Sequence, residues 1–189
     1  MKKKLNKIII FIFDKLFSFI IFITILPILF IIFSILYLFN NSEIFYISER
    51  IGYRNKKFKL IKFRTMKINS EDEITKIGKF LRKTSMDELP QLINVIKGDM
   101  CLVGPRPYPE YIFQNISETD IFLRHQVKPG LTGYSQINFT GKKRSLEEKI
   151  SHDIYFVKNY NFLLYLNVII KTPAIIIKRF YLNPTGKTL

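Results

Sequence analysis

The sequence predicts an α+β protein that is mainly helical, with an N-terminal membrane-embedded helix-break-helix followed by a small soluble domain. Three observations predict this class: a long uncharged apolar segment near the N-terminus, two strand-like segments around a polar turn, and helical spacing of apolar residues further along. We place the membrane anchor at 1–41. The soluble domain follows at 42–189, with a short β-hairpin and amphipathic helices at the membrane interface.

The uncharged segment Leu16–Phe39 has 24 residues, and as a straight helix it would be roughly 36 Å long, enough to cross a bilayer core. Pro27 lies midway and cannot donate to the Ile23 carbonyl, so the helix should bend there. Basic residues, which prefer the cytoplasmic side, flank the segment on both sides: Lys2, Lys3, Lys4 and Lys7 before it, and Arg50, Arg54, Lys56, Lys57 and Lys59 after it. A re-entrant hairpin keeps both clusters on one face of the membrane.

A single crossing is the alternative to the hairpin. A cleaved signal peptide is disfavoured by the length of the segment and by the absence of a small-residue cleavage site after Phe39. The bend frees backbone groups, for which Thr24 and Ser34 are candidate partners. Asp14 beside Lys15 is expected at the interface, or as one half of a neutralised surface pair.

In the soluble part, Ile44–Ile47 and Phe58–Phe63 are expected to be strands around a turn at Gly52–Lys57. Apolar spacing predicts three helices, at Ile74–Lys83, Glu88–Lys97 and Leu146–Val157. Gly98 is expected to end the second of them, and Gly98–Tyr108 to be a loop.

The last apolar segment, Phe162–Tyr181, is a poor second span because polar residues and a proline interrupt it: Asn167, Lys171, Pro173 and Lys178. One interpretation lays it flat at the lipid headgroups, with Lys171, Lys178 and Arg179 facing phosphate. The other makes it an ordinary core helix.

The net charge of +15 limits the kinds of partner. A surface this basic fits nucleic acid, anionic lipid or a phosphorylated substrate. Cys101 is the only cysteine, so no internal disulfide can form. No His and Cys metal cluster, P-loop or dinucleotide-binding glycine motif occurs in the sequence.

The adjacent carboxylates Asp87 and Glu88 are the strongest candidates for catalysis. Ser85-x-x-Glu88 matches a capping box, and Asp87 would itself cap a helix that places Pro90 in its first turn, so both carboxylates have a structural interpretation. In the functional interpretation, an ionised Asp87 attacks phosphorus and forms an acyl phosphate. Mg²⁺ would be needed to offset the repulsion between the acid and a diphosphate.

The turn Gly104–Pro107 holds Arg106 between two prolines, which fix φ on both sides of it. A guanidinium held in this way loses little freedom when it grips a phosphate, although a rigid surface turn with a solvated arginine fits the same pattern. Further candidates for phosphate or substrate binding are Lys62, Arg64, Arg82, Arg124 and Lys128. Each of the first three alone is more often surface charge, whereas Arg124 and Lys128 come before a turn that could approach a substrate backbone.

Taken together, these segments resemble the small monotopic phosphoglycosyl transferases of the bacterial sugar transferase family. The resemblance covers roughly residues 7–180. The matching segments, in chain order, are Phe13-Asp14, Pro27, Glu49-Arg50-Ile51-Gly52, Phe58–Met66, Gly78–Arg82, Thr84–Leu92, Gly98-Asp99-Met100, Val103–Pro107, Glu110-Tyr111, Arg124-His125, Lys128–Gly133 and Gln136-Ile137-Asn138.

The resemblance implies transfer of a sugar 1-phosphate from a UDP-sugar to undecaprenyl phosphate, with release of UMP, at the cytoplasmic face of the bacterial inner membrane. That reaction would begin synthesis of a capsule, O-antigen, exopolysaccharide or glycoprotein glycan. By resemblance, Asp87 is the nucleophile and helps bind Mg²⁺, Glu88 assists the acceptor phosphate, Arg106 binds phosphate, and Pro27 marks the membrane bend. Anionic membrane lipid would be a further partner, and nucleic acid would not.

The chain departs from the family pattern at three places. Leu26 stands before Pro27 where many members have serine, Lys128 stands where arginine is usual, and the segment 138–144 differs from the usual one and has an apparent insertion. The last change leaves the sugar open. The rival to an enzyme is a non-catalytic, membrane-tethered basic adaptor that binds anionic lipid or nucleotide.

Overall fold

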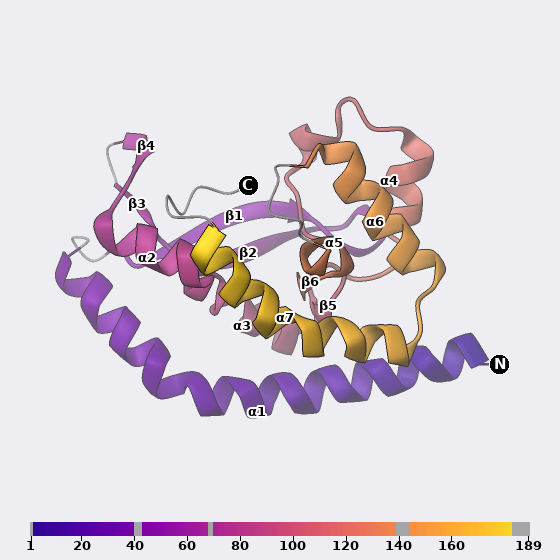
Figure 1. Ribbon diagram of the computed structural model, residues 1–189, viewed down its shortest axis with the longest axis horizontal. Coiled ribbons are helices and arrows are strands. Elements are labelled where there is room, and N and C mark those ends of the chain that lie inside the picture. Colours follow the sequence, from indigo (N-terminus) through magenta and orange to yellow (C-terminus); the bar gives the residue numbers. More distant parts are fainter. Residues whose placement is uncertain (1, 40–42, 68–69, 139–143, 183–189) are drawn as a thin grey trace.

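The computed structural model describes residues 2–39, 43–67, 70–138 and 144–182 (Figure 1). Its helices are α1 Lys2–Phe39, α2 Lys76–Thr84, α3 Gln91–Lys97, α4 Glu118–Arg124, α5 Tyr134–Ile137, α6 Leu146–Lys158 and α7 Phe162–Leu182. The strands are β1 Phe45–Ile51, β2 Lys57–Phe63, β3 Met66–Lys67, β4 Ser70–Ile74, β5 Cys101–Val103 and β6 Gly130–Thr132, and 3-10 turns lie at Tyr53–Asn55, Met86–Glu88 and Glu110–Phe113. The predicted class, mainly helical α+β, is confirmed.

Helix α1 is continuous and contains Pro27. Figure 1 shows its axis turning in its second half, the half that contains Pro27, and the helix continues without the predicted break. Ile8–Phe39 is the one helix among the described residues that is long and apolar enough to cross a membrane. The re-entrant course remains a prediction, and the boundary predicted at residues 41 and 42 lies outside the described residues.

Hydroxyl side chains on α1 do not reach the carbonyl that Pro27 frees. Thr24 Oγ1 donates to the Ile20 carbonyl at 2.9 Å, and Ser34 Oγ donates to the Phe30 carbonyl at 2.9 Å. Both are ordinary bonds to the residue four positions earlier in a helix. We expected Thr24 or Ser34 to donate to a backbone group freed at the bend, but neither side chain donates to the Ile23 carbonyl.

The N-terminal half of α1 is tied to the rest of the protein by two polar side chains. Asp14 is buried and accepts hydrogen bonds from the Tyr165 hydroxyl and from the Leu102 backbone N–H, the latter at 3.3 Å. Lys15 Nζ donates to the Val95 carbonyl at 3.3 Å and to the Ile96 carbonyl, both in the last turn of α3. The expectation of a surface pair is wrong, because Asp14 and Lys15 each have their own hydrogen-bond partners outside α1.

Strands β1 and β2 form the predicted antiparallel hairpin, with Phe45 opposite Phe63 and Ile51 opposite Lys57. The first strand is longer than predicted and runs to Ile51. β3 and β4 also pair antiparallel, so Ile74 ends a strand and α2 begins only at Lys76, after the Thr75 cap. Gly98 ends α3 in the left-handed conformation as expected, with φ of 96°.

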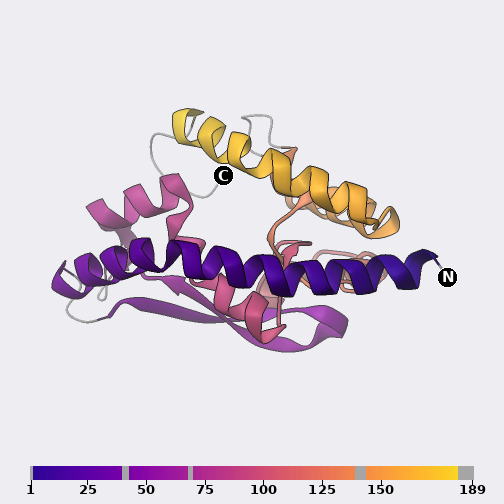
Figure 2. The same ribbon diagram turned by 90° about the horizontal axis from the view of Figure 1, so that it is seen from below.

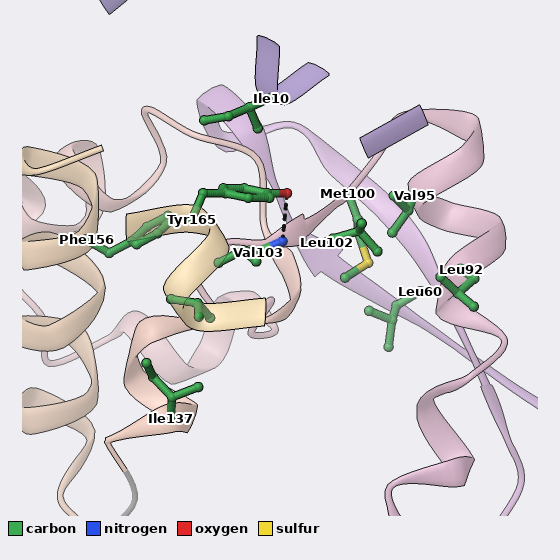
Figure 3. Close-up of a cluster of buried hydrophobic side chains, with 11 residues drawn as sticks. Ile10, Leu60, Leu92, Val95, Met100, Leu102, Val103, Ile137, Phe156 and Tyr165 are labelled. Carbon is green, nitrogen blue, oxygen red and sulfur yellow. Dashed lines mark hydrogen bonds between the residues drawn. The ribbon is translucent and has the colours of Figure 1, made fainter. Parts of the chain in front are cut away.

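The main core gathers side chains from α1, β2, α3, β5, α5, α6 and α7. Figure 3 shows Tyr165 and Phe156 on one side of this cluster and Leu60, Leu92 and Val95 on the other, with Met100 and Leu102 between them. The Tyr165 hydroxyl also accepts a hydrogen bond from the Val103 N–H at 3.0 Å. Ile10 of α1 belongs to the same cluster, so the long apolar helix packs directly on the core formed by the rest of the protein.

The segment predicted as a loop after Gly98 contains β5, which pairs in parallel with β6. Backbone hydrogen bonds extend the pairing beyond β5: Gly104 N–H donates to the Thr132 carbonyl at 2.9 Å, and Gly130 N–H donates to the Pro105 carbonyl at 3.0 Å. A Cβ on Gly130 would overlap the Gly104 nitrogen and the Thr132 carbonyl. Glycine is therefore required because two backbones touch there.

We expect Gly130→Ala to lower the free energy of unfolding by about 3 kcal/mol, because the added methyl group must push two backbones apart. Denaturant unfolding followed by circular dichroism in detergent would measure the loss. Gly52→Ala is the control, since the nearest atom to its Cβ is a Phe58 ring carbon at 3.1 Å, which can move. Equal unfolding midpoints for the two variants would contradict the backbone contact.

Helix α7 and the β1–β2 hairpin lie on opposite sides of the molecule, and α1 runs along the face seen in Figure 2. Tyr165 and Val168 of α7 are buried, whereas Leu163, Ile170, Ile177 and Tyr181 are exposed. The helix thus has one packed face and one outward apolar face. Its predicted position at the membrane interface remains a prediction.

Candidate active site

Asp87 and Glu88 lie in the 3-10 turn Met86–Glu88 between α2 and α3. The turn follows Ser85, whose φ of 58° is left-handed and costs about 1 kcal/mol or more in a residue other than glycine. Neither predicted cap exists: the N-cap of α3 is Pro90, and neither Ser85 nor Pro90 makes a side-chain capping bond. The helix begins only after Pro90, which leaves both carboxylates available for other partners.

The Glu88 carboxylate is held by two cations. Its Oε1 accepts from Lys62 Nζ at 2.7 Å and from Arg106 Nη2 at 2.7 Å. Burial alone would raise the pKa of Glu88, but Arg106 and Lys62 outweigh it and hold that pKa far below its ordinary value. Glu88 is therefore a permanent anion that fixes two positive side chains in place.

Asp87 lies beside this cluster and has a different electrostatic environment. It is 9% exposed, and no hydrogen bond among the described residues engages its carboxylate. Burial and the neighbouring Glu88 charge raise the pKa of Asp87 to about 6, against the opposing effect of Lys62, Arg106 and Arg82. The two adjacent acids therefore differ in their partners. Glu88 is paired with two cations, whereas Asp87 is ionised at neutral pH and its carboxylate accepts no hydrogen bond from the described residues.

Asn94 places Lys62 opposite the carboxylate turn. The Asn94 side chain on α3 accepts from the Ile61 N–H at 3.2 Å and donates to the Lys59 carbonyl at 2.8 Å. It therefore pairs with the backbone of β2 as a neighbouring strand would. Since the turn leads directly into α3, this clamp brings Glu88 to the side chain of Lys62.

Arg106 is fixed through its backbone as well as its side chain. Backbone hydrogen bonds to β6 hold Gly104 and Pro105 in place. The Arg106 carbonyl accepts a hydrogen bond from Arg124 Nη2. Among the other predicted phosphate ligands, Arg82 donates through Nε to Thr65 Oγ1 at 2.8 Å and lies close enough to lower the pKa of Asp87. The structure thus brings together Asp87, Glu88, Lys62, Arg82 and Arg106.

Arg124 and Arg64 have other partners. Arg124 is 1% exposed, and its Nε donates to Asp153 Oδ2 at 2.9 Å. We predicted substrate binding for Arg124, but its guanidinium is used to neutralise a buried acid and to support the Arg106 carbonyl. Arg64 Nη2 pairs with Glu43 Oε2 at 2.8 Å, at the end of the hairpin.

Lys128 lies in a different part of the molecule. It lines a cavity of about 230 Å³ together with Asp14, Lys15 and Tyr160, between α1 and the rest of the protein. His125 is buried beside Arg124, and burial together with that positive charge lowers its pKa to about 4. His125 is therefore neutral and structural.

Three further arginines were not predicted to belong to the site: Arg50 and Arg179, which lie near Arg106, and Arg144, which lies near Arg179. Burial lowers the pKa of Arg50 and of Arg179, and the positive charge of Arg106 lowers both further. Among the described residues, Nε and Nη1 of Arg144 are buried with no hydrogen-bond partner. In the sequence, Arg144 stands out only as the end of the unusual segment 138–144, and nothing there indicates that it lies near Arg179.

The residues present fit a magnesium ion only with help from substrate. The described residues contain no group of three or more His, Cys, Asp or Glu side chains that could hold a metal, and Glu88 Oε1 is already paired with two cations. Magnesium sites in phosphoryl transfer use one or two carboxylates completed by phosphate oxygens and water. Asp87 with a bound diphosphate would meet that requirement.

Three known proteins with similar sequences are named as sugar transferases or sugar-phosphate transferases. The chain is 34% identical over 156 residues to the UDP-N-acetylgalactosamine-undecaprenyl-phosphate N-acetylgalactosaminephosphotransferase of Aeromonas hydrophila, covering 75% of this chain and 37% of the relative. It is 42% identical over 142 residues to the uncharacterized sugar transferase EpsL of Bacillus subtilis, covering 70% and 69%. It is 35% identical over 178 residues to the UDP-glucose:undecaprenyl-phosphate glucose-1-phosphate transferase of Klebsiella pneumoniae, covering 84% and 38%.

The chain therefore spans little more than a third of the length of two of these relatives. The match to a family is broader. A family model described as bacterial sugar transferase matches residues 5–179, which include α1, the carboxylate turn, the Arg106 loop and most of α7. The cation-locked Glu88 and the adjacent Asp87 thus lie within the matched region, and the chain belongs to the bacterial sugar transferase family.

Proposed function

We propose that this protein transfers a sugar 1-phosphate from a UDP-sugar to undecaprenyl phosphate through a covalent phosphosugar on Asp87. The observation that carries the proposal is the contrast between the two acids. Glu88 is committed to Lys62 and Arg106, while Asp87 keeps an ionised carboxylate beside three cations. A nucleophile placed next to fixed positive charge is what attack on a diphosphate requires.

In the first step a carboxylate oxygen of Asp87 attacks the phosphorus that bears the sugar. The bond from that phosphorus to the bridging oxygen breaks, and UMP leaves with the electron pair. Lys62 and Arg106, held by Glu88, lie where the growing negative charge can be neutralised. Mg²⁺ bound by Asp87 and the diphosphate would reduce the repulsion between nucleophile and substrate.

In the second step an oxygen of the lipid phosphate attacks the same phosphorus. The bond between phosphorus and Asp87 breaks, and the carboxylate is restored with no net change in protons. The two substrates need not be bound together, which suits a water-soluble donor and a membrane-bound acceptor. We further propose that α1 and α7 seat the protein at the cytoplasmic face of the inner membrane, where this step would begin synthesis of a surface polysaccharide or glycoprotein glycan.

The test is UMP release by the purified full chain with Mg²⁺, undecaprenyl phosphate and a panel of UDP-hexoses and UDP-N-acetylated sugars. We expect release of UMP and formation of a lipid-linked sugar diphosphate with at least one donor. Release with none of them, together with retained binding to anionic vesicles, would favour a membrane-tethered adaptor instead. The donor that reacts would identify the sugar.

The pH dependence of the first step tests the state of Asp87. Because its pKa is raised to about 6 and only the ionised form attacks, the UMP burst measured without acceptor should fall roughly tenfold per pH unit below that value. Glu88→Gln removes a neighbouring negative charge, so the pKa of Asp87 should drop and the acid limb of the profile should move to lower pH. The exposed Glu118→Gln on α4 is the control, and an unmoved limb in the Glu88 variant would contradict the assignment.

A further inference from the structure

Helix α7 presents chemically different residues on its two faces. Leu163, Ile170, Ile177 and Tyr181 are 78%, 74%, 59% and 76% exposed, and their spacing of seven, seven and four places them on one side of the helix. The opposite side carries Tyr165, Val168 and Thr172 and continues to Arg179. Lys178, the neighbour of Arg179, is exposed. The structure therefore separates two residues that the sequence placed together at the headgroups.

Contacts along this inner face hold the end of α7 close to the carboxylate turn. Thr172 Oγ1 lies 2.9 Å from Thr132 Oγ1 on β6. Lys83 lies in the last turn of α2, and its Nζ is 4.0 Å from the centre of the Phe180 ring on α7. Because α2 ends at Thr84, three residues before Asp87, the residue beside Phe180 is brought to the edge of the site.

The electrostatic neighbours of Arg179 agree with this placement. Burial lowers the pKa of Arg179. The positive charges of Arg106 and Arg144 lower this pKa further, and the negative charge of Glu88 opposes them. Arg144 reaches the same region from the start of α6, where its Nη2 donates to the Ser135 carbonyl at 2.5 Å. Its Nε and Nη1 are buried without a hydrogen-bond partner among the described residues. Buried guanidinium nitrogens of this kind are ready to bind an additional anion.

We propose that Arg179, together with Arg144, forms a second anion-binding position that takes the phosphate monoester of the isoprenoid acceptor. The inference rests on the proposed function and assigns one substrate to one side of the site. A phosphate attached to a lipid must arrive from the membrane, and α7 joins an exposed apolar face to the partly buried cation Arg179. The isoprenoid chain would lie along that apolar face while the phosphate reaches the phosphorus on Asp87.

The kinetic test separates the two half-reactions in the full chain. We expect Arg179→Gln to raise the KM for undecaprenyl phosphate at least tenfold and to leave the UMP burst without acceptor, and the KM for the UDP-sugar, within twofold. Arg179→Lys should recover part of the loss. Lys178→Gln, one residue away and exposed, is the matched control and should change neither KM. A variant with normal acceptor KM, or one that loses the donor burst instead, would overturn the proposal.

Direct binding gives a readout that needs no turnover. We would titrate the detergent-solubilised full chain with farnesyl phosphate, and separately with farnesol, inorganic phosphate and short-chain phosphatidylglycerol. Tenfold weaker binding of farnesyl phosphate to Arg179→Gln, with farnesol unchanged, supports an acceptor-phosphate site. Equal loss for phosphatidylglycerol would show a general lipid-headgroup site, and unchanged binding of all four would overturn the inference.

The two tests also keep the inference apart from the proposed function. Wild-type protein that releases no UMP but binds farnesyl phosphate through Arg179 would refute the transferase reaction and retain the binding site. Equal melting temperatures of Arg179→Gln and Lys178→Gln would show that lost acceptor affinity does not come from unfolding.

Discussion

Asp87→Asn is expected to reduce sugar-phosphate transfer on the order of 10⁴-fold or more, since a neutral amide cannot act as the attacking group. The fold should survive, because no hydrogen bond among the described residues depends on that carboxylate. The measurement is UMP release in a purified assay, with the melting temperature recorded for the same preparation. Normal turnover by the variant would remove the nucleophile from the mechanism.

Intact-mass analysis makes the same prediction more specific. Wild-type protein given the reactive UDP-sugar without acceptor should gain the mass of one phosphosugar, and digestion should locate it on the peptide that contains residue 87. Asp99→Asn, an exposed carboxylate after α3, is the control and should still acquire the adduct. Product formation with no adduct at any time point would indicate direct transfer instead.

Arg124→Met is expected to destabilise the protein by about 3–5 kcal/mol, the largest loss of stability that we predict, because it leaves the Asp153 charge buried and uncompensated. Arg124 and Asp153 are each 1% exposed, so water cannot take over the lost interaction. Thermal unfolding in detergent would measure the effect. A variant as stable as the wild type would contradict the stabilising role that we assign to the Arg124–Asp153 ion pair.

The double variant Arg124→Met with Asp153→Leu separates charge burial from loss of packing. Removing both charges together should recover most of the stability lost in the single variant, since an apolar pair needs no desolvation. The rings of Tyr108 and Phe113, which lie 5.1 and 5.4 Å from the Arg124 guanidinium carbon, provide apolar surroundings. Recovery to less than half would show that the bond from Arg124 to the Arg106 carbonyl matters more than the ion pair.

Local sequence signals predicted most of the secondary structure. The hairpin, the end of α3 at Gly98 and the helix α6 follow from strand alternation, a helix-stopping glycine and apolar spacing, which act between residues close together in the chain. Strands β5 and β6 were missed for the opposite reason. Each has three residues, and they pair across about 30 positions of the chain, so neither carries a strand pattern of its own.

The carboxylate pair shows how far local reasoning reaches. The sequence picked out Asp87, Glu88 and Arg106, but capping rules could not decide whether the acids served a helix. That answer depended on where α3 begins and on Lys62, which lies 26 residues before Glu88 and pairs with it at 2.7 Å. Arg124 was misjudged for the same reason, because its partner Asp153 is 29 residues away.

The chemical groups themselves could be identified from the sequence: a long apolar helix with a proline, two adjacent acids, and an arginine between two prolines in a basic chain. Only the tertiary structure shows which of these groups pair with one another and which have no partner among the described residues. Pairing assigned Glu88 to Lys62 and Arg106 and left Asp87 ionised and unbonded, and it turned Arg179 inward while Lys178 stayed exposed. Charge interactions fall off with distance in space, and only folding sets the distances between residues far apart in the chain.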